Sequence, residues 1–265
     1  MAVFTKMSIV PSYTRGFAFS WEIAPDFDDP LPWTFAIEAG QASVDTEWEE
    51  LTPPGGVTNV FNWTEDAARL VNKKLVLYFR IRLITPNGVY YSYVRTPYGD
   101  LDRREYLIVR EIMRKEILQA EKLAGVLGRL WIRSTFGAIC YDCRDPVTGS
   151  IRNKNCDICY GTGRSPGFHG PYCVWMTFST ANRDTQMAKD GTGTREPYVY
   201  SVRMIGSPYA KDGDVVVDPR QDKRYYVDSV KSEMEIRRIP VIQTAVAREV
   251  PVSDYIHNLG LVPEE

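Results

Sequence analysis

The first hundred residues alternate hydrophobic and polar positions in short runs that turn residues separate. The period of two is that of half-buried β-strands, and it is clearest at residues 17–23, 33–38 and 75–83. After the third run, Asn87-Gly88 predicts a hairpin into residues 89–94, because both residues tolerate positive φ. A break at Pro53-Pro54-Gly55-Gly56 divides these strands. The pattern predicts several short antiparallel strands in two packed sheets.

From residue 100 the period changes to that of a helix. Asp102 can cap a helix that begins near Arg103, with Glu105 in its first turn. Apolar and charged residues then mix at helical spacing, which indicates one apolar stripe docked on a neighbour and a solvated opposite face. Gly125 and Gly128 loosen the pattern, so we expect the helix to end around residues 127–130.

The last hundred residues return to strand periodicity. Strands are predicted at 173–178, 198–204, 214–218, 225–230 and 241–250, with 219–224 as a hairpin loop. The polar stretch 181–197 is predicted to be a loop, mobile around Asp190–Thr194. Its Gly-x-Gly lacks the helix that a phosphate-binding turn requires. The expected product is a small antiparallel barrel or curled sheet.

Four of the five cysteines form two Cys-x-x-Cys pairs within twenty residues: Cys140, Cys143, Cys156 and Cys159. Two such knuckles can supply four thiolates to one tetrahedral Zn²⁺, with Zn–S distances of about 2.3 Å. Four protein ligands leave no position for water, so such a site is structural and not hydrolytic. Gly161 and Gly163 allow the chain to fold back toward the sulfurs, where amide groups can donate to them. The sequence therefore predicts a zinc knuckle at about residues 138–165.

Other interpretations of this window stay open. Two disulfides would use the same four cysteines, a redox-active pair would use two of them, and His169 is a candidate substitute ligand. Cys173 lies outside the spacing and is predicted to be a buried thiol. The window is also basic, through Arg144, Arg152, Lys154 and Arg164. These charges either offset a zinc–tetrathiolate centre or, with Tyr141 and Tyr160 stacking on bases, serve nucleic acid.

Composition limits the function classes. The 265 residues include 32 Lys and Arg against 34 Asp and Glu, so no overall charge favours nucleic acid or an anionic membrane. With two histidines, His169 and His257, most His-based catalytic schemes have no place, and we expect no enzyme. Asp26, Asp28 and Asp29 are predicted to form a solvated acidic loop. The start lacks the apolar core of a secretory signal and no apolar run could span a bilayer, so we expect synthesis in a reducing cytoplasm.

Two resemblances follow from these motifs. Residues 5–97 resemble a fibronectin type III or related Ig-like module, on Trp21, Trp33, Trp48 and the strand Tyr78-Phe79-Arg80-Ile81-Arg82 with its hairpin. This resemblance implies an Ig-like β-sandwich over residues 1–99. The whole chain is then expected to be mainly β, with residues 100–265 forming a second unit. That unit would hold the long helix, the zinc-ribbon-like insert and a small C-terminal antiparallel β-barrel or sheet.

The second resemblance lies in the C-terminal strands. The segments 213–218, 224–230, 239–243 and 251–254 resemble virion connector proteins of tailed bacteriophages, which join the capsid portal to the tail. The run Cys159-Tyr160-Gly161-Thr162-Gly163 is similar to a cysteine-rich insert of phage structural proteins. The resemblance implies a neck, head-completion or stopper protein in the virion, assembled in the host cytoplasm and without catalytic residues.

The implied partners are other copies of the chain in a ring, portal and tail proteins, and DNA that passes through the channel without sequence-specific contact. No membrane contact is expected. Another tail or baseplate protein is the nearest alternative. A zinc-ribbon protein that binds nucleic acid is the alternative from a different class, and it predicts binding that weakens steeply with salt.

Overall fold

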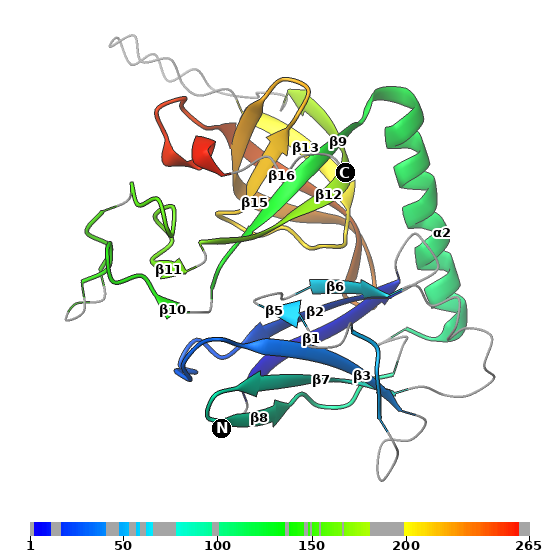
Figure 1. Ribbon diagram of the computed structural model, residues 1–265. Coiled ribbons are helices and arrows are strands. Elements are labelled where there is room, and N and C mark those ends of the chain that lie inside the picture. The colour runs from blue at the N-terminus through cyan, green and yellow to red at the C-terminus, as the bar shows by residue number, and fades with distance from the viewer. Residues whose placement is uncertain are drawn as a thin grey trace. The chain divides into compact units, whose positions relative to one another are not determined.

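A computed structural model describes residues 3–11, 17–40, 48–52, 57–58, 62–65, 78–96, 101–135, 138–145, 148, 150–153, 155–165, 167–180 and 199–259. The fold is mainly β, as predicted, with 51% of the residues in strands and one helix of 22 residues (Figure 1). The predicted break at Pro53–Gly56 and the loop at Asp190–Thr194 lie outside the described residues. No helix in the part described is both long and apolar enough to cross a lipid bilayer.

Compactness divides the chain into two units. Unit 1 comprises Met1–Arg114, Ser134–His169 and Ile236–Ile239, and unit 2 comprises Lys115–Arg133, Gly170–Glu235 and Pro240–Glu265. The predicted domain boundary after residue 99 stays a prediction.

The described strands of residues 4–91 form two antiparallel sheets in unit 1. The first has the strand order β1-β2-β6 and the second the order β4-β3-β7-β8, with β5 also pairing with β3. Their bounds are β1 Phe4–Pro11, β2 Phe17–Ile23, β3 Thr34–Gly40, β4 Glu49–Glu50, β5 Val57–Thr58, β6 Asn62–Glu65, β7 Tyr78–Thr85 and β8 Gly88–Tyr91. The strands predicted at 17–23 and 33–38 are confirmed, and the predicted β7–β8 hairpin is present with Pro86 and Asn87 as its turn.

Aromatic side chains join the faces of these two sheets. The Phe19 ring on β2 lies 5.1 Å from that of Phe79 on β7, and the Trp21 ring lies 5.2 Å from that of Phe35 on β3. All four side chains are at most 1% exposed. Alternation along each strand places them on one face, so the period of two seen in the sequence defines the shared core.

Asp29 departs from the predicted solvated acidic loop. Its carboxylate accepts hydrogen bonds from the Thr85 hydroxyl at 2.6 Å, the Tyr90 hydroxyl at 3.0 Å and the Asn87 amide at 3.2 Å. The bond from Thr85, followed by those from Asn87 and Tyr90, lowers the pKa of Asp29 against the opposing effect of desolvation. Asp26 and Asp28 are exposed, as predicted, whereas Asp29 is half-buried and its carboxylate binds the β7–β8 hairpin.

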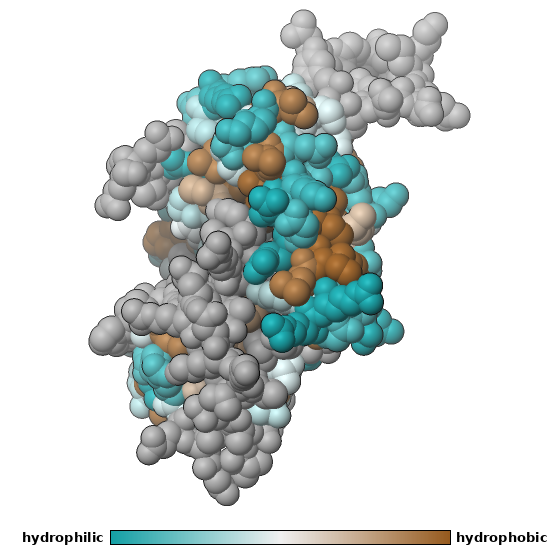
Figure 2. Space-filling model, turned by 90° about the vertical axis from the view of Figure 1, so that its right-hand side faces the viewer, coloured by the Kyte–Doolittle hydropathy of each residue, from teal (hydrophilic) through white to brown (hydrophobic). Residues whose placement is uncertain are grey.

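The helix α2, Arg103–Gln119, begins as predicted. Asp102 accepts from the Glu105 amide at 2.8 Å, and Glu105 accepts in return from the Asp102 amide at 2.9 Å, which is a capping box. The predicted apolar stripe is buried at Tyr106, Val109, Met113 and Ile117. The solvated side is not uniformly polar, since Figure 2 shows hydrophobic residues among hydrophilic ones there and the Leu118 side chain is 47% exposed.

The predicted helix end at residues 127–130 is wrong. The helix passes into a π-helical turn, Ala120–Ala124, which the Gly125 amide closes by donating to the Ala120 carbonyl at 2.7 Å. A Cβ atom on Gly125 would lie 2.5 Å from that carbonyl oxygen, so only glycine permits this closure. The chain then enters strand β9, Val126–Arg133, whose apolar residues had the spacing of a continuing helix.

Unit 2 contains a closed barrel of six strands in the order β12-β13-β16-β15-β14-β9. The bounds are β12 Phe168–Thr180, β13 Val199–Ile205, β14 Val215–Asp218, β15 Lys223–Ile236 and β16 Ile239–Glu249. The predicted C-terminal barrel is thus confirmed, with β9 as the strand that was not foreseen. Its interior is apolar, with Val202, Val215, Val217, Val241 and Ala245 fully buried. Closure pairs the strands with one another, and the packed side chains inside stabilise the barrel.

Candidate metal centre

The four predicted ligands lie in a loop of unit 1 that two short strands close. These strands, β10 (Ala138–Ile139) and β11 (Arg164–Ser165), pair in antiparallel fashion. Between them an isolated bridge joins Arg144 to Ile151, and the Arg152 amide donates to the Cys143 carbonyl at 2.7 Å. Backbone hydrogen bonds thus shape the loop, and its buried side-chain cluster consists of the four cysteines.

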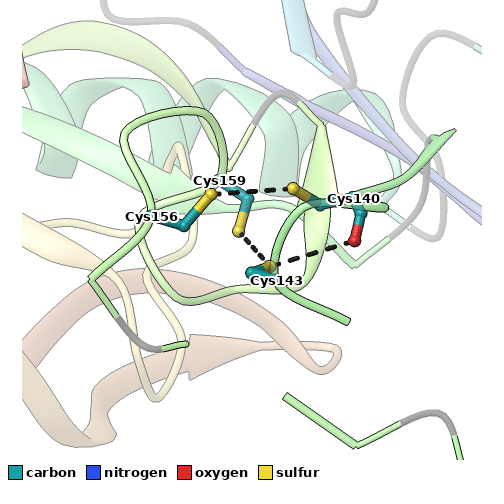
Figure 3. A group of neighbouring side chains, drawn as sticks. All are labelled: Cys140, Cys143, Cys156 and Cys159. Carbon is teal, nitrogen blue, oxygen red and sulfur yellow. Dashed lines mark hydrogen bonds between the residues drawn. The ribbon is translucent and has the colours of Figure 1, made fainter. Parts of the chain in front are cut away.

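Each Cys-x-x-Cys folds as a tight turn. The Arg144 amide donates to the Cys140 carbonyl at 3.1 Å, and the Tyr160 amide donates to the Cys156 carbonyl at 2.8 Å. Each turn directs its two sulfurs to the same side, and the two turns face each other (Figure 3). The spacing in the sequence and the turn geometry therefore bring all four thiols to one point.

The four sulfur atoms lie within 4.8 Å of one another. Cys140 Sγ is 3.7 Å from Cys156 Sγ, and Cys143 Sγ is 3.0 Å from Cys159 Sγ. A tetrahedron with Zn–S arms of about 2.3 Å has edges of roughly 3.8 Å, so small shifts suffice to place one ion at the centre. The four side chains are between 0 and 6% exposed, and the group thus forms a closed pocket of sulfur.

Backbone amides donate to two of the sulfurs. The Asp142 amide points at Cys140 Sγ, and the Gly163 amide points at Cys159 Sγ. Burial raises the pKa of the Cys140 and Cys143 thiols, whereas for Cys159 the hydrogen bonds from Cys143 and Gly163 outweigh burial and lower the pKa. Such amide donors stabilise metal-bound thiolates, which is the role predicted for the glycines after the second knuckle.

Left-handed backbone brings these amides into position. Gly161 and Gly163 have φ of 76° and 75°, as the sequence indicated, but Tyr160 also adopts a positive φ of 52°. A tyrosine in this region is disfavoured, so no sequence rule would have placed it there. Gly167 makes a further close approach, since a Cβ atom on it would lie 2.2 Å from the Cys159 carbonyl oxygen.

The basic residues of the window take different positions. The Arg152 side chain donates to Asp145 at 3.0 Å, and Lys154 lies outside the described residues. Arg144 and Arg164 lie close enough that, after burial, the charge of Arg144 lowers the pKa of Arg164. A metal bound by four thiolates carries a net charge of about −2, which would offset two neighbouring guanidinium groups.

The structure bears on the alternatives of two disulfides and of His169 as a ligand. All five cysteines are free thiols, so neither of the two disulfides is present. Among the described residues, the group able to hold an ion consists of the four cysteines, and His169 does not belong to it. The prediction that Cys173 is buried is wrong. Val174 and Met176 on the same strand β12 face the core, and the alternation of a strand turns Cys173 to solvent.

The residues present fit a metal ion. Four buried sulfurs at these separations, with amide donors to two of them, favour a thiophilic ion such as zinc. A complete shell of protein ligands gives such an ion no open position for substrate or water. In comparisons with known proteins, no family model and no curated sequence matches the chain, so the arrangement of these residues carries the assignment of the site.

Proposed function

We propose that the protein is a structural virion component of a tailed bacteriophage that assembles as a ring at the neck and joins the capsid portal to the tail. The observation that carries the proposal is the resemblance of the segments 213–218, 224–230, 239–243 and 251–254 to phage connector proteins. The first three of these segments fall on β14, β15 and β16, which lie side by side in the closed barrel, and the fourth follows β16. The resemblance thus falls on one folded element and not on scattered strands.

The metal centre in this proposal is structural zinc. Cys140, Cys143, Cys156 and Cys159 are its ligands, and Zn²⁺ supplies the crosslink that the short β10–β11 pair lacks. The closed sulfur shell supports a role in stiffening a loop of the assembly. The same closed shell supports a protein without enzymatic activity. The two histidines also support this, since His169 is buried and His257 contacts Arg224.

The N-terminal sheets take the part of an Ig-like, fibronectin type III module in this proposal. The strand order supports it, because β1-β2-β6 opposite β4-β3-β7-β8 corresponds to the A-B-E and C′-C-F-G sheets of such sandwiches. The buried Trp21 lies on β2, the strand that corresponds to B. Domains of this kind present loops and sheet faces on a rigid frame, which suits an external module of a virion protein.

The test is the location of the chain in assembled particles. Particles that carry an epitope tag on this protein are labelled with antibody and imaged by electron microscopy, with a tagged capsid protein as the control. We expect label at the head–tail junction in every particle. Label at the baseplate would support the alternative of another tail protein, and absence from purified particles would refute the proposal.

A further inference from the structure

The barrel contains a strand much longer than one of its neighbours. β15 has 14 residues, whereas β14 beside it has four. The ladder between them covers Lys223–Tyr226, and hydrogen bonds of Val227 with Gly213 and Asp214 extend it by one residue. Within the described residues, β15 then continues to Ile236 with β16 as its neighbour on the other side. Among the residues that the structure describes, no strand pairs with the other edge of residues 228–236, and we call this edge the open edge.

Hydrogen bonds earlier in β15 show which backbone N–H and C=O groups point to this open edge. The Val227 amide donates to Asp214 on the β14 side, whereas the Arg224 carbonyl accepts from Val250, just beyond the end of β16. Because N–H and C=O groups alternate sides along a strand, those of Ser229, Lys231 and Glu233 point to the open edge. An edge of this kind is a template for one more strand.

The side chains of the segment are accessible and mixed in character. Ser229, Lys231 and Glu233 are exposed, and Met234 is 41% exposed although it is apolar. A charged edge resists indiscriminate pairing, since an incoming strand must place opposite charges across from Lys231 and Glu233. The open edge therefore selects its partner by charge.

The same segment of a second copy meets this requirement in one antiparallel register. When Ser232 faces Ser232 of the other copy, Lys231 faces Glu233 and Glu233 faces Lys231. Val230 then lies opposite Met234, an apolar pair, and Ser229 lies opposite Glu235. Moving the register by two residues either way brings two lysines or two glutamates face to face, which is unfavourable. The register also places Lys231 and Glu233 at hydrogen-bonded positions, in agreement with the backbone directions above.

We propose that two copies of this chain pair through the open edge of β15 in this two-fold register and so continue the barrel sheet from one copy into the next. Glu233 can accept the added lysine, because its bonds from Arg203 and Thr244 leave acceptor capacity on both oxygens. The inference does not rest on the virion proposal: a ring closes through a different, heterologous surface, so either can fail alone.

Site-specific crosslinking tests the register. In a Cys173→Ser background, Ser232→Cys places two thiols at the two-fold axis, with Cα atoms about 4.5 Å apart at a non-hydrogen-bonded position, which a disulfide can bridge. The matched control Ser229→Cys lies on the same exposed strand, roughly 20 Å from its own copy in this register. With oxidised glutathione as the oxidant, we expect a disulfide dimer from Ser232→Cys and monomer from Ser229→Cys. Equal crosslinking of both, or of neither, overturns the proposal.

Sedimentation velocity tests the charge pairs on the native chain. We expect a dimer that forms with rising protein concentration, and Lys231→Glu should raise its dissociation constant roughly tenfold by turning two attractive pairs into repulsive ones. Lys122→Glu makes the same charge change on the helix and should leave the dimer intact. A monomer at every concentration, or a dimer insensitive to Lys231→Glu, means that this edge is not the interface.

Discussion

The cysteine loop and the barrel are built on opposite principles. The loop has two strands of two residues each, and its buried cluster consists of four sulfurs. The barrel closes six strands around an apolar interior. A closed ladder with a packed core is stable through its own contacts, whereas a loop of this kind gains its stability from an ion. We therefore expect the stability of the loop, and not that of the barrel, to depend on a bound metal ion.

Removing a metal ligand should have the largest effect and should be confined to the loop. Cys143→Ser replaces a fully buried thiolate, and structural zinc sites contribute on the order of 10 kcal/mol of apparent binding energy. We expect loss of stoichiometric zinc, measured by elemental analysis, and new protease cleavage between residues 140 and 163. Cys173→Ser, at an exposed position, is the control and should change neither. A zinc-free loop that stays resistant would show that the loop is not metal-dependent.

A core truncation in the barrel should have the converse effect. The Tyr225 ring is 2% exposed and lies 5.0 Å from Tyr200 and 5.5 Å from Phe178. Tyr225→Ala should lower the free energy of unfolding by about 3–5 kcal/mol, because it removes a large buried ring. Denaturant unfolding measures this loss, and zinc content should stay at one equivalent. A variant that also loses zinc would contradict the independence of the two parts.

The barrel should also depend on pH through Asp214. This carboxylate is 1% exposed and accepts the amides of Arg133 and Lys211, and burial raises its pKa to about 7 against these bonds. An acid whose folded pKa lies above its unfolded value stabilises the fold fully below the unfolded pKa, near 4, and loses this contribution as pH rises through 7.

We therefore expect the barrel to lose roughly 2–4 kcal/mol between pH 4 and 7 from this group. Denaturant unfolding at a series of pH values measures how the free energy of unfolding changes with pH. Asp214→Asn should abolish the part of this change that comes from Asp214. It should also lower the stability somewhat, because the asparagine side chain leaves one of the two backbone amides unpaired. If wild type and Asp214→Asn have parallel profiles, Asp214 does not titrate in this range.

The smallest effect concerns one amide at the metal centre. Gly163→Ala strains a backbone with φ of 75° and displaces the amide that donates to Cys159. Zinc affinity should fall about 10–100-fold, the usual cost of losing a partner of a ligand, as measured by competition with a chelator. Gly161→Ala at φ of 76° carries the same strain and is the matched control, with a smaller expected loss. Equal losses would assign the effect to strain alone.

Local pattern and spacing determined much of this protein. The strands at 17–23 and 33–38, the capping box of Asp102 and Glu105, and the four cysteines were all predicted, because each depends on residues close together in the chain. The positive φ at Gly161 and Gly163 was also foreseeable, since glycine is the residue that adopts it without cost.

Tertiary structure decided the rest, wherever a distant contact outweighed the local preference. Val126–Arg133 continues a helical spacing but forms β9, because barrel closure needs a strand there. Arg237 and Arg238 form the turn between β15 and β16, and both have positive φ. The sequence did not predict this turn, because the usual signal for such a hairpin is Asn-Gly. Asp29 belongs to an acidic loop by sequence, yet Thr85 and Tyr90 reach it only after β7 and β8 have paired. The sequence alone determined which residues can form a strand, a turn or a metal ligand. The pairing of strands that are distant in the sequence determined which of these residues come into contact.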